Sequence, residues 1–135
     1  MSRIDGPRVL VVEDDEDLRE LLRDALEEAG YAVVAACTGR EAMNVLEKLS
    51  LATWSTGAVD LVLTDLYVPE VTGAELVRLL RTARWPVPVV LMTAYASTVL
   101  RESTRAMGIP LLEKPFTLEE MRTTVRAELL RIRPA

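Results

Sequence analysis

The sequence predicts an α/β protein, a doubly wound parallel sheet of five strands covered by five helices, and three observations predict it. Five short apolar, β-branched segments alternate with longer segments that have the hydrophobic period of helices. Segments such as 9–12 and 61–63 are apolar at every position, which is typical of parallel strands buried on both faces. The chain has 135 residues, of which 50% are hydrophobic, enough for one core without disulfides or a structural metal. We therefore expect a single domain over residues 1–135.

Each predicted strand is followed by a helix. The strands are expected at residues 8–13, 31–35, 59–65, 87–92 and 109–112. The first helix has a clear apolar stripe from Leu18 to Ala29, and Gly30 is suited to end it. The last helix, 117–132, begins with a capping box formed by Thr117 and Glu120. This alternation is what a parallel sheet with helices on both faces requires.

Two segments are less regular than the rest. The fourth helix, over 97–107, contains Ser, Thr and Val where good helix formers are usual, so we expect it to be mobile or loosely packed. The segment from Leu51 to Ala58 contains Ser, Thr and Gly between the second helix and the third strand. We expect it to be a surface loop away from the functional site.

The composition excludes several classes of function. The chain has no His, which removes Ser-His triads, His-ligated zinc and a phosphohistidine on this chain. Its net charge of −5 is a poor match for nucleic acid, so we expect no direct nucleic acid binding. A single Cys, Cys37, and the lack of a signal peptide or an apolar run of membrane-spanning length indicate a cytoplasmic protein without a membrane segment.

Chemically active side chains stand where four of the predicted strands end. Because the carboxyl ends of parallel strands meet at one edge of the sheet, these residues should gather there. Clustered carboxylates repel unless a cation lies among them, and few hard oxygen ligands suit Mg²⁺ together with a phosphoryl group. In strand order the residues are Glu13 and Asp14, Asp65, Thr93 and Ala94, and Lys114 and Pro115.

Each of these residues also has an ordinary structural interpretation. The acidic run 13–17 fits a helix start, as Asp15 and Asp17 do, and Asp65 fits a turn before Pro69. Thr93 alone fits a strand end, and Lys114 fits a solvated turn. Their joint occurrence at four strand ends is what favours a magnesium and phosphoryl site.

Four segments resemble, in order and at family spacing, the receiver domain of two-component response regulators of the chemotaxis-regulator type. They are VLVVEDDEDLRELL, DLVLTDLYVPEVTGAEL, VVLMTAYAS and LLEKPF, and together they extend over nearly the whole chain. The resemblance implies a flavodoxin-like sheet with strand order 2-1-3-4-5. It also implies that the protein switches when it accepts a phosphoryl group from the phosphohistidine of a kinase.

The resemblance assigns roles to the acidic residues. Asp65 would be the phosphoacceptor, and Asp14 would ligate Mg²⁺ directly. Glu13, which replaces the commoner Asp, would act through a metal-bound water, and Asp65 and the backbone carbonyl of Tyr67 would complete the protein ligands. An ionised carboxylate needs no general base to attack phosphorus, so the chemistry agrees with these roles.

Further roles and two departures follow from the same resemblance. Thr93, Ala94 and Lys114 would bind the phosphoryl group, and the bond between Lys114 and Pro115 is expected to be cis. The family usually has an aromatic switch residue where this chain has Leu111, so Thr93 and the fourth helix are expected to carry the change. Ile109 and the residue after it replace the acidic pair of one dimerising subgroup, so that dimer is not expected.

Three functions are compatible with such a site. The first is a phosphoacceptor switch, with a sensor histidine kinase or phosphotransfer protein upstream and a downstream protein or fused output domain. Such a protein catalyses only its own phosphorylation and dephosphorylation, as a monomer or a phosphorylation-dependent dimer. A Mg²⁺-dependent phosphatase would need a second acid where Tyr67 stands. A phosphorylation-independent interaction module would have lost acceptor, metal or Lys positions, yet all are present.

Two further expectations concern the phosphorylated state. Hydrolysis of a phosphoryl group on Asp65 should be slow, because the bulky Tyr67 and Tyr95 flank the approach of water. The partner-binding face should comprise the fourth helix, the fifth strand and the fifth helix, where Val99 and Ala106 form a stripe beside that of Leu100 and Met107.

Overall fold

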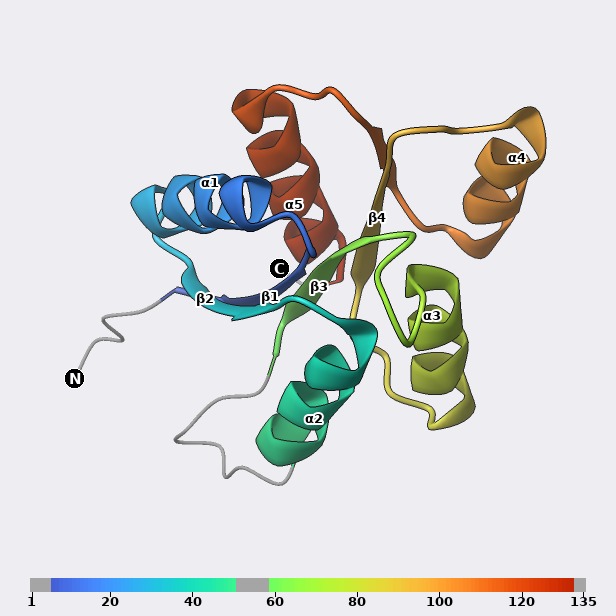
Figure 1. Cartoon of the computed structure of the whole chain (residues 1–135), viewed down its shortest axis with the longest axis horizontal. Coiled ribbons are helices and arrows are strands. Elements are labelled where there is room, and N and C mark those ends of the chain that lie inside the picture. The colour runs from blue at the N-terminus through green and yellow to red at the C-terminus, as the bar shows by residue number, and fades with distance from the viewer. Residues whose placement is uncertain (1–5, 51–58, 133–135) are drawn as a thin grey trace.

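The computed structural model describes residues 6–50 and 59–132 and contains ten elements in strict alternation (Figure 1). The five strands are β1 (Arg8–Val12), β2 (Ala32–Ala36), β3 (Leu61–Asp65), β4 (Val89–Thr93) and β5 (Leu111–Glu113). The five helices are α1 (Glu16–Glu28), α2 (Gly39–Ser50), α3 (Gly73–Thr82), α4 (Thr98–Met107) and α5 (Leu118–Ile132). The expected loop from Leu51 to Ala58 lies outside the described residues.

The strands form one parallel sheet in the order β2-β1-β3-β4-β5, so the predicted fold class and strand order are confirmed. β3, β4 and β5 start two residues later than expected, at Leu61, Val89 and Leu111. β4 and β5 are each preceded by a proline, Pro88 or Pro110, which has no N–H to donate to a neighbouring strand. The carbonyl oxygens of both prolines still accept from the neighbouring strand, at 2.9 and 3.0 Å.

Successive residues of β1 serve two separate hydrophobic cores. Leu10 and Val12 pack with α2 and α3 on one face of the sheet, and Val9 and Val11 pack with α1 and α5 on the other. Every residue of β3 and β4 is buried, as expected for central parallel strands. Helices therefore cover both faces of the sheet, and its carboxyl edge is where chemically active side chains can meet a ligand.

The helix starts have the side-chain caps that their sequences predict. Asp15 accepts hydrogen bonds from two backbone N–H groups at the start of α1. Thr117 and Glu120 bond each other's backbone N–H groups before α5, at 2.8 and 3.0 Å, so the predicted capping box is present. Several of these starts lie at the carboxyl edge of the sheet, so the caps fix the loops that surround the site.

Helix α4 is the one that packs poorly. Thr104 is its only buried residue, whereas Val99 is 75% exposed. Met107 is 55% exposed although its spacing places it on the same stripe as the half-buried Leu100. These exposures agree with the expectation of a loosely packed fourth helix.

Among the helices of the described residues, none has both the length and the apolar character needed to cross a membrane.

Candidate functional site

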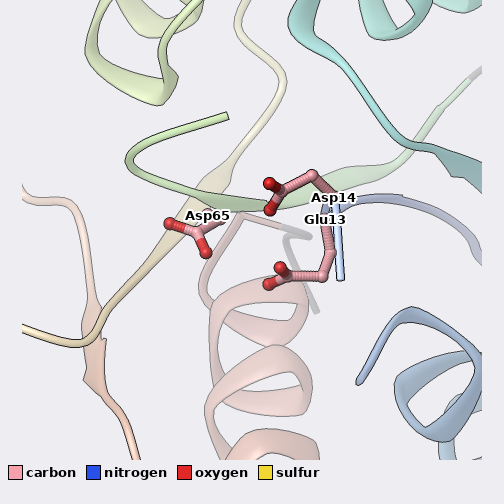
Figure 2. A group of neighbouring side chains, drawn as sticks. All are labelled: Glu13, Asp14 and Asp65. Atoms are coloured by element: carbon pink, nitrogen blue, oxygen red, sulfur yellow. The ribbon is translucent and has the colours of Figure 1, made fainter. Parts of the chain in front are cut away.

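Three carboxylates meet at the carboxyl edge of the sheet. Glu13 and Asp14 directly follow β1, and Asp65 is the last residue of β3, which pairs with β1. One carboxylate oxygen from each residue lies within 4.8 Å of the other two, and Figure 2 shows the side chains gathered there. Glu13 and Asp65 are buried, whereas Asp14 is exposed. The sheet register alone brings these residues together, as the sequence predicts.

The ammonium group of Lys114 connects two of these carboxylates. Its Nζ donates to Oε1 of Glu13 at 3.0 Å and to Oδ2 of Asp65 at 2.5 Å. The backbone N–H of Lys114 also donates to the carbonyl of Thr93 at 2.7 Å, which continues the pairing of β4 with β5. The bond to Pro115 is cis, as predicted. Lys114 is thereby held at the site by its backbone as well as by its side chain.

Burial and charge set the proton affinities within this cluster. Burial raises the pKa of Glu13, and the charge of Asp65 adds to the effect, although hydrogen bonds from the Asp15 N–H and from Lys114 oppose it. Burial lowers the pKa of Lys114, but hydrogen bonds to Asp65 and Glu13 outweigh it, so the net shift is upward. Lys114 is therefore charged at neutral pH.

The loop after Asp65 is fixed by short-range contacts. The Tyr67 N–H donates to Oδ1 of Asp65 at 3.0 Å, so donors hold both oxygens of this carboxylate. The Gly73 N–H donates to the carbonyl of Leu66 at 2.8 Å, where α3 begins. A Cβ at Gly73 would lie 2.8 Å from the Asp65 carbonyl oxygen, closer than real contacts allow. Glycine is thus needed for α3 to approach the end of β3 this closely.

Thr93 is fully buried, and its hydroxyl is engaged by the loop that follows it. The hydroxyl donates to the carbonyl of Tyr95 at 3.1 Å and accepts from the Tyr95 N–H at 3.2 Å. The hydroxyl therefore ties the end of β4 to the loop that leads into α4. In this structure the Thr93 hydroxyl makes no hydrogen bond with Asp65.

The remaining predicted residues differ in exposure. Ala94 is exposed, and Leu111 is half-buried against the core beneath α2 and α3. Tyr67 and Tyr95 are 68% and 77% exposed. Both rings are open to solvent in this structure, so they would slow hydrolysis only if they cover the phosphoryl group once it forms.

Sequence reasoning missed three contributors to the site. The Arg19 guanidinium donates to the carbonyl of Glu13 at 2.8 Å, and the Asp15 N–H donates to Oε2 of Glu13 at 3.1 Å. Arg19 lies on the polar face of α1, where periodicity predicts only contact with water. The close approach of Gly73 was equally hidden, because it depends on how α3 meets the sheet.

The donor set fits a divalent cation. Three carboxylates opposed by one ammonium leave two negative charges at the cluster, which a divalent cation would neutralise. Hard carboxylate and carbonyl oxygens are the ligands that Mg²⁺ prefers, and Mg²⁺ commonly uses only one or two carboxylates with several waters. Glu13, Asp14 and Asp65 are the residues that could hold it.

The fold and the site together define an α/β protein of flavodoxin-like topology with an acidic, Lys-bearing carboxyl edge. The family model described as the response regulator receiver domain matches residues 9–126. The chain therefore belongs to the receiver domains of two-component response regulators. These domains interact with histidine kinases and output domains, and the family generally uses Mg²⁺.

Known relatives agree with this family. The chain is 36% identical to YrkP of Bacillus subtilis (strain 168), described as an uncharacterized transcriptional regulatory protein, over 92% of this chain and 50% of that protein. It is 36% identical to the response regulator MprA of Mycolicibacterium vanbaalenii, over 94% of this chain and 52% of that protein. The chain thus spans about half the length of these curated relatives.

A solved structure agrees with the fold. The non-phosphorylated HemR receiver domain of Leptospira biflexa superposes with a TM-score of 0.79 at 33% identity, over 96% of this chain and 99% of that one. The match extends over nearly the whole of that structure but over only about half of the regulators, because that structure contains a receiver domain alone.

Proposed function

We propose that this receiver domain accepts a phosphoryl group on Asp65 from the phosphohistidine of a sensor histidine kinase or phosphotransfer protein. The observation that carries the proposal is the contact of Lys114 with Asp65 inside a cluster of three carboxylates. This arrangement combines a nucleophile, a fixed positive charge and oxygen ligands for Mg²⁺ at one point. The domain would catalyse only its own phosphorylation and dephosphorylation.

The chain's own residues supply the positioning. The Tyr67 N–H and the Lys114 ammonium hold the two oxygens of Asp65, and each oxygen keeps a second lone pair with which to attack phosphorus. A phosphorus–oxygen bond forms as the phosphorus–nitrogen bond of the donor breaks, and the imidazole leaves with that electron pair. Lys114 then lies beside the new phosphoryl oxygens, where its charge stabilises them.

A bound Mg²⁺ would supply charge neutralisation for the transferring group. Asp14 and Asp65 would ligate it directly, Glu13 would act through a water, and the backbone carbonyl of Tyr67 would complete the protein ligands. The buried Glu13 is held by the Asp15 N–H and Lys114, so its carboxylate is oriented in advance.

The switch would begin at Thr93. Phosphoryl oxygens are strong acceptors, and they would draw the Thr93 hydroxyl away from the Tyr95 carbonyl to which it now donates. The loop after β4 would lose that bond just before α4, whose only buried residue among its ten is Thr104. With Leu111 at the usual aromatic position, α4 rather than a side chain on β5 would carry the change.

The partners and location follow from this role. A downstream protein or a fused output domain would recognise α4, β5 and α5, with the domain as a monomer or a phosphorylation-dependent dimer. Direct nucleic acid binding is not expected of a chain with a net charge of −5. We place the protein in the cytoplasm, where two-component kinases deliver their phosphoryl groups.

The proposal is tested by incubating the chain with acetyl phosphate and Mg²⁺ and measuring its intact mass with and without a chelator. We expect one phosphoryl group per chain, lost when the chelator is present or when Asp65 is replaced by Asn. An Asp65→Asn variant that gains a phosphoryl group at the wild-type rate would disprove the assignment. A wild-type chain that gains none would favour a phosphorylation-independent interaction module.

A matched pair of variants tests the metal ligands. Asp14→Ala should abolish the Mg²⁺-dependent gain of mass, because Asp14 belongs to the carboxylate cluster. Asp17→Ala should leave it unchanged, because Asp17 lies in the first turn of α1. Equal losses in the two variants would mean that the acidic run acts through its overall charge.

A further inference from the structure

An apolar groove separates α3 from α4 on the face of the sheet that these helices share. Its volume is about 540 Å³, within the range of small-molecule sites in proteins. Leu66, Val77 and Leu91 lie along it and are buried, and Leu100 and Met107 of α4 also line it. α3 and α4 stand side by side at one end of the molecule in Figure 1. The groove exists because α4 does not close down onto α3.

The charges that line this groove are all positive, although the chain carries a net charge of −5. Arg78 and Arg81, one turn apart on α3, line it, and among the described residues no acidic side chain does. The Arg81 guanidinium is already engaged, because it donates to the carbonyls of Trp85 and Val87. Arg78 is exposed and makes no hydrogen bond or close ion pair within residues 6–50 and 59–132, although its charge helps to lower the pKa of Glu75, one turn earlier on α3.

Three residues with hydroxyl groups line the groove, Thr82, Ser103 and Thr104. The Thr104 hydroxyl already donates within its own helix, to the carbonyls of Leu100 and Arg101. An occupant would meet mainly apolar side chains along its length and an exposed guanidinium at the edge. Burial of apolar surface would give the affinity, and the guanidinium would select the charge.

We propose that the groove between α3 and α4 is a binding site for a small amphiphile that has an apolar body and one anionic group. The apolar body lies against Leu66, Leu91 and Leu100, and the anionic group pairs with Arg78. This site is separate from the carboxylate cluster, whose residues do not line the groove. It therefore requires no phosphorylation of Asp65.

Calorimetric titration of the full chain tests the proposal with two amphiphiles of equal chain length. Sodium decanoate and decyltrimethylammonium bromide are each used below the concentration at which they form micelles. We expect one decanoate to bind per chain and the cationic amphiphile to bind at least about threefold more weakly. The absence of saturable decanoate binding, or equal binding of the two amphiphiles, would overturn the proposal.

Two substitutions on α4 locate the binding. Ser103→Trp places a large ring in the groove, because Ser103 lines it, and should weaken decanoate binding at least about tenfold. Glu102→Trp adds the same ring one residue earlier, where it does not line the groove, and should change the affinity less than about twofold. Equal effects of these two variants would place the ligand elsewhere.

Two charge reversals test the head group. Arg78→Glu should weaken decanoate binding about threefold and strengthen binding of the cationic amphiphile, since an exposed charge pair contributes modestly. Lys48→Glu makes the same change in net charge on α2 and should alter neither. If Lys48→Glu has the same effect as Arg78→Glu, selection arises from net charge and the assignment of Arg78 is wrong.

Asp65→Asn separates this site from the proposed phosphorylation. The variant should bind decanoate with unchanged affinity, because Asp65 does not line the groove. Loss of phosphorylation with retained decanoate binding is the expected combination. Loss of decanoate binding in Asp65→Asn would contradict a groove site that is independent of the acceptor.

Discussion

Helices α3 and α4 are equally long, with ten residues each, and they follow neighbouring strands, yet they are held very differently. α3 buries Gly73, Leu76, Val77 and Leu80, whereas α4 buries only Thr104. α3 follows the strand that ends in the acceptor candidate Asp65, and α4 follows the strand that ends in Thr93. The helix that follows Asp65 is thus anchored in the core, whereas the helix that follows Thr93 is loosely packed.

The loops that lead into the two helices differ in the same way. The loop before α3 is bonded to the Asp65 carboxylate through Tyr67, and Thr72 and Glu75 form a capping box at its end. The loop before α4 is tied to Thr93 mainly by one hydroxyl. Positioning a nucleophile requires a fixed frame, and a switch requires an element of low local stability. The unequal packing of these two helices would meet both needs of the proposed function.

The largest expected effect tests this difference in packing. Leu76→Ala should lower the free energy of unfolding by about 3 kcal/mol, because Leu76 is 1% exposed in the core. Leu100→Ala on α4 should lower it by only about 1 kcal/mol, because Leu100 is half-buried. Urea unfolding monitored by circular dichroism measures both. Equal losses would mean that α4 contributes as much core as α3.

A smaller effect is expected at the ends of the two helices. Gly108, the residue that caps the end of α4, has a φ of 70°, and Arg84, two residues after α3, has a φ of 57°. Gly108→Ala should destabilise the protein by about 1 kcal/mol, because left-handed backbone disfavours a Cβ. Arg84→Gly should stabilise it by about 0.5 kcal/mol for the same reason. In the same unfolding assay, the two substitutions should change the free energy of unfolding in opposite directions. A change in the same direction would contradict the argument from the left-handed backbone.

The smallest effect concerns the two tyrosines in the compared loops. Replacing Tyr67 and Tyr95 together with Ser should change the lifetime of the phosphorylated protein by no more than about twofold, because both residues are largely exposed. The decay of phosphorylated mass after removal of acetyl phosphate gives the lifetime. A much faster decay would show that the rings cover the phosphoryl group once it forms.

The sequence could predict the fold and the carboxylate cluster because both depend on local patterns and on strand register. Fully apolar strands specify a parallel sheet. Such a sheet brings Glu13, Asp14 and Asp65 to one edge, and this does not depend on how the helices pack. The contact of Lys114 with Asp65 follows from the same geometry. An error of one or two residues in a predicted strand end therefore does not change the prediction of either feature.

The sequence could not predict features that depend on how one element meets another. Met107 shares a helical stripe with Leu100 but is 55% exposed, because the distance between α4 and α3 decides whether the stripe is covered. The exposure of Tyr95 and the close approach of Gly73 to Asp65 have the same origin. Periodicity predicts which face of a helix a residue occupies, but it does not predict how close the neighbouring helix or strand lies.

We infer that α4, and not α3, responds to occupation of the acceptor. Amide hydrogen exchange with Mg²⁺, measured with and without beryllofluoride as a phosphoryl mimic, distinguishes the two helices. We expect altered protection over Thr98–Met107 and unchanged protection over Gly73–Thr82, with both helices unaffected in Asp65→Asn. Altered protection confined to α1 and α2, or equal changes in α3 and α4, would contradict it.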